Sequence, residues 1–121
     1  MGDYKRLDVW ELASELAIHV YKLTFKGKLN KDFSFRDQMR RAAISVPSNI
    51  AEGEESGFDK VGVRYFYQAK ASLAELNTQL IIAHQIEYIE TNEFQEISEK
   101  VTSISKMLRK LIDYRVKFNE N

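Results

Sequence analysis

The most constraining feature of this sequence is an apolar repeat that advances by three or four residues along most of the chain. An α-helix has about 3.6 residues per turn, so this spacing places the apolar side chains on one face. The repeat predicts one helix over about residues 60–88 and another over about 92–118. Its members there are Phe66, Ala69, Leu73, Leu76, Leu80 and Ala83, then Phe94, Ile97, Val101, Ile104, Leu108 and Leu111.

The same spacing predicts two shorter helices, over about residues 8–25 and 34–52. Four amphipathic helices with short connections are typical of a four-helix bundle whose neighbours are antiparallel. The chain of 121 residues is long enough for one such core. We therefore expect an all-α, up-down-up-down bundle in a single domain over residues 1–121. The shorter stripes are Trp10, Ala13, Ala17 and Val20, then Met39, Ala43, Val46 and Ile50.

Several residues are candidates for the ends of these helices. Asp8 and Glu11 have the spacing of a capping box, and "KGKLN" is expected to interrupt the helical pattern after the first helix. Gly53 is a candidate C-terminal cap, because glycine adopts the backbone conformation that ends many helices. The remaining candidates, all N-caps, are Asp59 for the third helix and Thr91 or Asn92 for the fourth.

Pro47 is the single proline of the chain and lies inside the second apolar stripe. Proline within a helix removes one hydrogen bond and costs about 3 kcal/mol. One interpretation is a helix kinked at Pro47, with Ser45 and Ser48 bonding carbonyls of the previous turn. The other is a helix that stops at Val46 and restarts with Pro47 in its first turn. The continuous apolar phase favours the kink.

Composition excludes several classes of protein. The chain has no cysteine, which excludes disulfides and thiolate metal sites and is consistent with the cytoplasm. Lys plus Arg and Asp plus Glu each number 18, so the neutral total argues against a strongly basic nucleic-acid binder. No apolar run approaches the roughly 20 residues that span a bilayer, so we expect no membrane association through a spanning helix.

We find no pattern that indicates catalysis or a cofactor. A di-metal bundle site needs Glu-x-x-His pairs, whereas Glu15 precedes His19 by four residues and Ile81 precedes His84 by three. Ser45 and Ser48 lack the surroundings of a nucleophile elbow. No small-molecule substrate is evident. We therefore expect a protein that is not an enzyme and has no metal or cofactor.

Two groups of basic residues are candidates for contact with nucleic acid. Because the second and fourth helices would start at the same end of the bundle, the two groups should lie toward opposite ends of one protomer. Such residues would contact phosphates, with steep salt dependence and little sequence readout. The candidates are Arg36, Arg40 and Arg41 in the second helix and Lys106, Arg109, Lys110, Arg115 and Lys117 in the fourth.

The first and third helices carry more apolar residues than one stripe needs. A wide buried face would explain them, and so would an interface between copies of the chain. The second interpretation predicts a homo-oligomer. Its candidate interface residues are Ile18, Tyr21, Tyr65, Tyr67, Ile81, Ile82 and Ile86.

Four segments together resemble the 23S rRNA intervening-sequence protein family of bacteria, also called the S23 family. They are "YKRLDVWELASELAIHVYKLT", "RRAAISVPSNIAEG", "RYFYQAKASLAELNTQLIIAHQIEYI" and "ISKMLRKLI", which cover nearly the whole chain. The resemblance implies an up-down four-helix bundle that forms a homopentamer, kinship with accessory proteins of diversity-generating retroelements that bind nucleic acid, and no enzyme. The signature positions besides Arg40 and Arg41 are Ser45, Pro47, Asn49, Glu52, Gly53, Ser72, Glu75 and Leu76.

This chain departs from the family pattern after Gly53, where acidic Glu54 and Glu55 replace basic residues and weaken the case for nucleic-acid binding at that turn. We interpret the signature residues as structural, with Asn49 and Glu52 bonded across the bundle. The leading hypothesis is a homo-oligomeric bundle with RNA or DNA as partner. The alternative is a protein–protein interaction scaffold without a nucleic-acid role.

Overall fold

Every element of the described part of the chain is helical. The structure is a computed structural model that describes residues 3–57 and 59–120, with side chains through residue 117. The predicted all-helical class is therefore confirmed. The elements are the 3₁₀-helix η1 (Tyr4–Arg6) and the α-helices α1 (Asp8–Thr24), α2 (Gly27–Lys31), α3 (Phe33–Glu55), α4 (Asp59–Gln85) and α5 (Thr91–Glu120).

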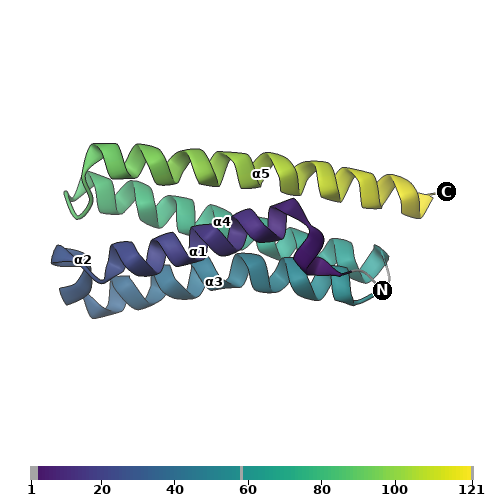
Figure 1. Cartoon of the computed structure of the whole chain (residues 1–121), viewed down its shortest axis with the longest axis horizontal. Coiled ribbons are helices and arrows are strands. Elements are labelled where there is room, and N and C mark those ends of the chain that lie inside the picture. Colours follow the sequence, from purple (N-terminus) through teal and green to yellow (C-terminus); the bar gives the residue numbers. More distant parts are fainter. Residues whose placement is uncertain (1–2, 58, 121) are drawn as a thin grey trace.

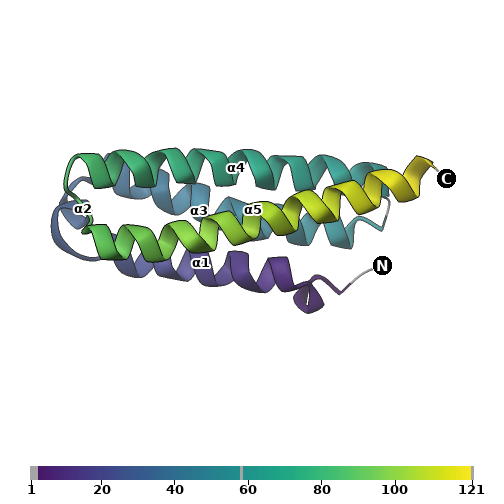
Figure 2. The same cartoon turned by 90° about the horizontal axis from the view of Figure 1, so that it is seen from above.

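The four long helices lie side by side, and the short helix α2 sits at one end of them (Figures 1 and 2). In Figure 1 the helices α1 and α4 run toward the α2 end, and α3 and α5 run away from it. The α2 end therefore joins the end of α1 to the start of α3, and the opposite end joins the end of α3 to the start of α4. The two groups of basic residues predicted on α3 and α5 are consequently near opposite ends.

The predicted apolar stripes form the core between the long helices. All four stripe residues of α3 and all six of α4 are buried, and in α5 only the terminal members Phe94 and Leu111 are half-buried. Burial of this apolar surface contributes roughly 25 cal/mol per Å² and holds the helices together. Among the described residues, no helix is both long enough and apolar enough to cross a membrane.

Pro47 lies within α3, which is continuous from Phe33 to Glu55. A helix that stops at Val46 and restarts at Pro47 is therefore not observed. The predicted bonds from Ser45 and Ser48 to carbonyls of the preceding turn are replaced by other contacts at Ser45, whose hydroxyl lies 2.9 Å from the Ser72 hydroxyl on α4. Asn49 donates to the Ser45 carbonyl at 2.8 Å and to its hydroxyl at 3.0 Å, within α3.

The predicted role of Asn49 and Glu52 as residues bonded across the bundle is thus wrong in its detail. The hydroxyls of Ser45 and Ser72 make the polar contact between α3 and α4. The Asn49 side chain donates to the Ser45 hydroxyl within α3. Glu52 is exposed, and its carbonyl accepts the Ser56 amide at the end of α3. Glu52 is three residues before the end of α3, and its position around the helix turns its side chain toward solvent.

The helix starts differ in detail from the sequence predictions. Helix α1 begins at Asp8 as expected, but Leu7 is its N-cap and makes no side-chain cap bond, so the capping box is wrong. Asp32 caps α3 by accepting the Phe35 amide at 3.3 Å, a role that sequence reasoning missed. Thr91 is the first residue of α5 and not its cap. Asp59 opens α4, and the cap position at residue 58 lies outside the described residues.

Gly53 is a packing residue and not the predicted helix cap. It is buried inside α3, which continues to Glu55 with Ser56 as its C-cap, and the residue with positive φ is Gly57, at 74°. A Cβ at Gly53 would lie 2.6 Å from Cε1 of Phe66, and a Cβ at Gly62 would lie 2.7 Å from the Gly53 carbonyl oxygen. The two glycines therefore let the end of α3 and the start of α4 approach closely.

Candidate nucleic-acid interface

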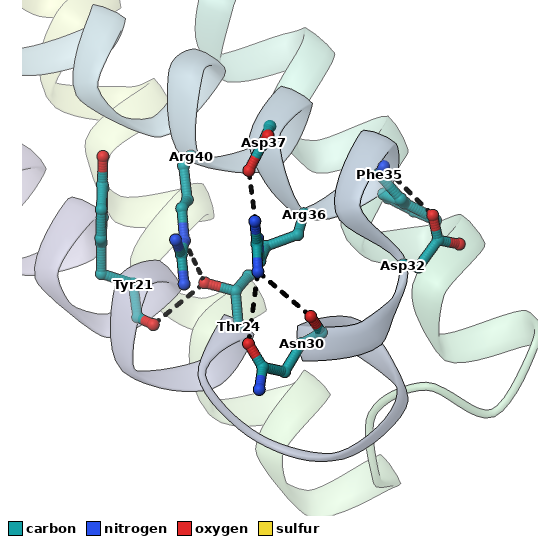
Figure 3. A network of polar contacts seen from close by, with 8 residues as sticks. All are labelled: Tyr21, Thr24, Asn30, Asp32, Phe35, Arg36, Asp37 and Arg40. Carbon is teal, nitrogen blue, oxygen red and sulfur yellow. Dashed lines mark hydrogen bonds and ion pairs between the residues drawn. The ribbon is translucent and has the colours of Figure 1, made fainter.

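Two arginines on successive turns of α3 organise the α2 end of the bundle. Arg36 donates from Nη1 to the Asn30 carbonyl at 3.1 Å and to the Asn30 side-chain oxygen at 3.4 Å. Its Nε lies 3.0 Å from the Asp37 carboxylate, and its guanidinium carbon lies 4.8 Å above the ring of Phe33. Figure 3 shows how Arg36 bridges from α3 to Asn30 on α2. The bond to a main-chain carbonyl fixes α2 against α3.

Arg40, one turn further along α3, lies among aromatic rings. Its Nε donates to the hydroxyl of the fully buried Thr24 at 2.8 Å, and that hydroxyl donates to the Tyr21 carbonyl at 3.0 Å (Figure 3). The guanidinium carbon lies 4.5 Å from the ring centre of Phe25 and 5.0 Å from that of Tyr21. Its Nη2 is buried and has no hydrogen-bond acceptor among the residues that the structure describes.

The segment from Tyr21 to Arg41 concentrates positive charge in a chain whose total is zero. It contains seven basic residues and two acidic ones, which gives a net charge of +5. We call this segment the basic–aromatic end. Lys22, Lys28 and Lys31 are exposed and form no ion pair within the described part of the chain, whereas Lys26 lies 3.6 Å from Glu93. A surface of this kind attracts polyanions at a distance.

Aromatic side chains are exposed among these charges. Of the five phenylalanines whose side chains are described, only Phe25 and Phe33 are exposed, at 62% and 65% of their surface. Both rings carry an arginine guanidinium above them. Sequence reasoning found Arg36, Arg40 and Arg41 but missed these rings and the four lysines of this end. The net charge of the whole segment from Tyr21 to Arg41 was the sequence feature that could have identified this surface.

Acidic residues lie beside this basic surface. The connection from α4 to α5 lies at the same end of the bundle (Figure 1). It carries Glu87 and Glu90, and Glu93 follows in the first turn of α5. The positive charge is therefore confined to the α1, α2 and α3 side of that end. This separation explains how a chain with zero formal net charge has a locally basic surface, and it defines the side from which a polyanion would approach.

The predicted basic residues of α5 fall into two kinds. Lys106, Arg109, Lys110 and Lys117 are exposed. Arg115 has a side chain only 18% exposed, contacts Glu54 through Nη2, lies 3.4 Å from Asp59 and stands 5.5 Å above the ring of Phe66. Arg115 therefore joins the end of α3 to the start of α4, and this pairing argues against a role in binding phosphate.

The remaining signature residues also make intramolecular contacts or line the core. Arg41 lies 3.9 Å from Glu75, and both side chains are largely exposed, so this pair contributes little to stability. Leu76 is fully buried in the core. Together with Ser45, Ser72 and Gly53, these residues form the contact between α3 and α4.

Five of the seven predicted interface residues are exposed apolar side chains. Four lie on α1 and α4, and Ile86 directly follows the end of α4; each exposes 44% to 55% of its surface, whereas Tyr21 and Tyr65 are half-buried. Scattered exposed apolar residues are ordinary, but three of these lie within six consecutive residues at the end of α4 and directly after it. The exposed residues are Ile18, Tyr67, Ile81, Ile82 and Ile86.

The two histidines are half-buried and bonded. Nδ1 of His19 lies 3.0 Å from Nζ of Lys100, which can only donate, so the ring proton is on Nε2, 3.9 Å from Glu93. Burial, followed by the charge of Lys100, lowers the pKa of His19 below its usual value. His84 stacks on Phe94 with ring centres 4.4 Å apart. Within the described residues, no three His, Asp or Glu side chains are grouped as metal ligands.

The fold and this surface define a helical-bundle protein with a basic–aromatic end. The family model of the 23S rRNA-intervening sequence protein matches residues 5–110. The chain therefore belongs to the 23S rRNA-intervening sequence protein family, as the signature segments predicted.

The fold is shared with a protein of known structure. The chain is similar to a crystal structure from Bacteroides thetaiotaomicron, described as a protein with unknown function from the S23 ribosomal protein family. The TM-score is 0.81 at 24% identity, over 87% of this chain and 95% of that one, which supports the fold. No curated protein matches the chain significantly. Neither the family name nor the description of the solved structure includes an enzymatic activity.

Proposed function

We propose that this chain is a non-enzymatic, homo-oligomeric bundle of the cytoplasm that binds nucleic acid through its basic–aromatic end. The observation that carries the proposal is the net charge of +5 between Tyr21 and Arg41, within a chain of zero formal charge. The exposed lysines Lys22, Lys28 and Lys31 could each contact a phosphate, because no ion pair within the described residues occupies them. Phosphate contacts of this kind supply affinity with little sequence readout.

The proposal includes the finer predictions about architecture. The bundle is an up-down-up-down antiparallel one, bent at Pro47, and by its family resemblance it assembles as a homopentamer. The exposed apolar residues Ile81 and Ile82 at the end of α4 and Ile86 directly after it support the assembly, since an oligomer would remove them from water. In a ring, one basic–aromatic end from each protomer would multiply the number of phosphate contacts.

The exposed basic residues of α5 are a second candidate surface. Lys106, Arg109 and Lys110 lie on the half of α5 that points away from the α2 end (Figure 1). This half of α5 also exposes the ring of Tyr114, at 64% of its surface, but its exposed basic residues do not match the net charge of +5 between Tyr21 and Arg41. We therefore propose the basic–aromatic end as the main contact and the α5 residues as a secondary one.

The test is a titration of a fluorescein-labelled RNA hairpin, followed by anisotropy at about 50 and 200 mM salt. We expect tight binding at the lower salt and a loss of affinity of at least about 10-fold at the higher. The variant K22Q/K28Q/K31Q should weaken binding and flatten the salt dependence. The matched control K106Q/R109Q/K110Q removes the same charge from α5 and should have a smaller effect.

Absence of binding at the lower salt would overturn the proposed function. If light scattering then showed a multimer, the alternative of a protein–protein interaction scaffold would take its place, with the apolar residues of α1 and α4 as its basis. Equal effects of the two triple variants would shift the contact from one end to the whole basic surface.

A further inference from the structure

The exposed rings of the basic–aromatic end have no evident structural task. Phe25 and Phe33 expose 62% and 65% of their surface, so burial contributes little to keeping phenylalanine at these positions. Each ring is nevertheless held, because Arg40 lies 4.5 Å from the ring centre of Phe25 and Arg36 lies 4.8 Å from that of Phe33. A cation above an aromatic face is attracted by about 0.5–1 kcal/mol at exposed sites.

The arginines that hold the rings are themselves fixed. Arg36 donates to the Asn30 carbonyl of α2, and Arg40 donates to the buried hydroxyl of Thr24. Residues four apart on a helix are neighbours, with Cβ atoms about 5–6 Å apart, so Arg36 and Arg40 present their rings from successive turns of α3. The two rings are therefore supported by one rigid helix, at the end of the bundle where the positive charge gathers.

We infer that Phe25 and Phe33 are stacking platforms for unpaired nucleobases, so that the ligand is single-stranded RNA or DNA, or the unpaired loop of a structured RNA. This inference rests on the proposed nucleic-acid function and specifies its ligand. Aromatic rings stack on bases of any sequence, and arginine planes do the same. A duplex keeps its bases stacked on each other and offers the rings nothing comparable.

The electrostatic surroundings match this ligand. Lys28 and Lys31 line one surface hollow together with Phe33, and Lys22 is exposed three residues before Phe25 in the sequence. These lysines can contact a phosphate backbone while a base lies on phenylalanine. Asp37 is the exposed acidic residue of the segment and is paired with Arg36 at 3.0 Å. Positively charged grooves with aromatic platforms are the general arrangement by which proteins bind single strands without sequence preference.

The experiment compares three probes of 12 nucleotides at about 150 mM salt: a single-stranded RNA, the DNA of the same sequence and the blunt RNA duplex. The key variant is F25L/F33L, which keeps apolar volume and removes both rings. For the wild type we expect single strands to bind at least about 10-fold more tightly than the duplex. For the variant we expect single-strand affinity to fall by at least about 10-fold. Duplex affinity should change by less than about 2-fold.

A spectroscopic signal separates stacking from other contributions. A single strand that carries 2-aminopurine should lose fluorescence on binding the wild type, since stacking quenches that base, and should keep it with F25L/F33L. The salt slope should be the same for both proteins, because neither phenylalanine is charged. The variant K28Q/K31Q should instead reduce the slope for all probes and retain the quenching of the bound complex.

The outcomes separate this inference from the proposed function. Equal affinity for single strands and duplex, unchanged in F25L/F33L, would overturn base stacking and leave phosphate binding intact. No binding of any probe at about 50 mM salt would overturn the proposed function itself. A smaller assembly of F25L/F33L in light scattering would also overturn the inference, because the rings would then belong to an interface between copies.

Discussion

Arg40 and Arg115 are the same residue type above aromatic rings at opposite ends of one bundle, yet their surroundings differ. Arg115 stands over the buried ring of Phe66 and pairs with two carboxylates, Glu54 and Asp59, whose side chains are 12% and 23% exposed. Arg40 stands over the exposed ring of Phe25 and has no carboxylate partner among the described residues. The first arrangement neutralises charge and joins helices. The second leaves the charge of Arg40 without a neutralising carboxylate among the described residues.

At the closed end of the bundle, where α3 ends and α4 begins, the two helices approach each other closely. Gly53 and Gly62 face each other there without room for a side chain, and Phe66 fills the space beside them. At the basic–aromatic end, large side chains project into solvent and the short helix α2 covers the core. The comparison therefore predicts that substitutions at the closed end reduce stability and that substitutions at the other end reduce binding.

The largest effect on stability is expected for Gly62→Val. A Cβ at position 62 would lie 2.7 Å from the Gly53 carbonyl oxygen, which belongs to the backbone and cannot move without displacing α3. Overpacking of this kind costs about 1–3 kcal/mol and occasionally more. We therefore expect the free energy of unfolding, measured with urea, to fall by about 3 kcal/mol. Ala71→Val, at an exposed position of the same helix, should cost less than about 1 kcal/mol. Equal losses would refute close packing of the glycines.

The second largest loss of stability is expected for Arg115→Met, and Arg40→Met should cost less stability. Removal of Arg115 leaves the half-buried carboxylates of Glu54 and Asp59 without their cation, and we expect a loss of about 2 kcal/mol. Removal of Arg40 leaves no unpaired carboxylate, so its cost should be about 1 kcal/mol or less, while affinity for RNA falls. Chemical unfolding and anisotropy titration measure the two quantities.

A double variant tests the cause of that difference. Glu54→Gln in the Arg115→Met background removes the carboxylate that the first substitution left alone, and part of the lost stability should return. If Arg40→Met destabilised the fold as much as Arg115→Met, the assignment of one arginine to structure and the other to binding would fail.

The smallest expected effect is the contribution of His19 to the pH dependence of stability. Burial and the neighbouring Lys100 lower the pKa of His19 in the folded state, so the unfolded chain binds the proton more readily. The stability that neutral His19 provides is therefore complete above about pH 6.5 and is lost as the pH falls below that value. Urea unfolding between about pH 7.5 and 5.5 should show a shallower decline for His19→Gln than for the wild type. An identical decline would contradict this role.

Much of the fold follows from periodicity alone. The long stripes on α4 and α5 repeat over many turns, and their members are buried as predicted. Helix α2 was missed because five residues with a single apolar side chain, Leu29, show no period. The role of Gly53 was misassigned for a different reason. A glycine required by a neighbouring helix looks the same in sequence as a glycine that ends its own helix.

The candidate site was predicted only in part because its members come from three elements. Arg36 and Arg40 share one helix face and could be read from their spacing. Phe25 and Phe33 lie at a helix end and a helix start, where no periodic pattern marks exposure. The pairing of Arg115 with Glu54 and Asp59 joins residues about sixty positions apart. Contacts of that range depend on how the helices pack, which the sequence pattern does not reveal.

The burial of Leu29 in α2 means that the backbone of this segment loses its conformational entropy on folding and not on ligand binding. This side chain is fully buried, and Arg36 bonds the carbonyl of the next residue, Asn30, so the connection between α1 and α3 is ordered without a ligand. Fixing the backbone costs about 1–2 kcal/mol per residue, and here that loss occurs when the chain folds. Lys28 and Lys31 therefore keep their backbone positions before and after an encounter. The phosphate contacts proposed for them would therefore not carry the cost of ordering the backbone, as contacts from a flexible loop would.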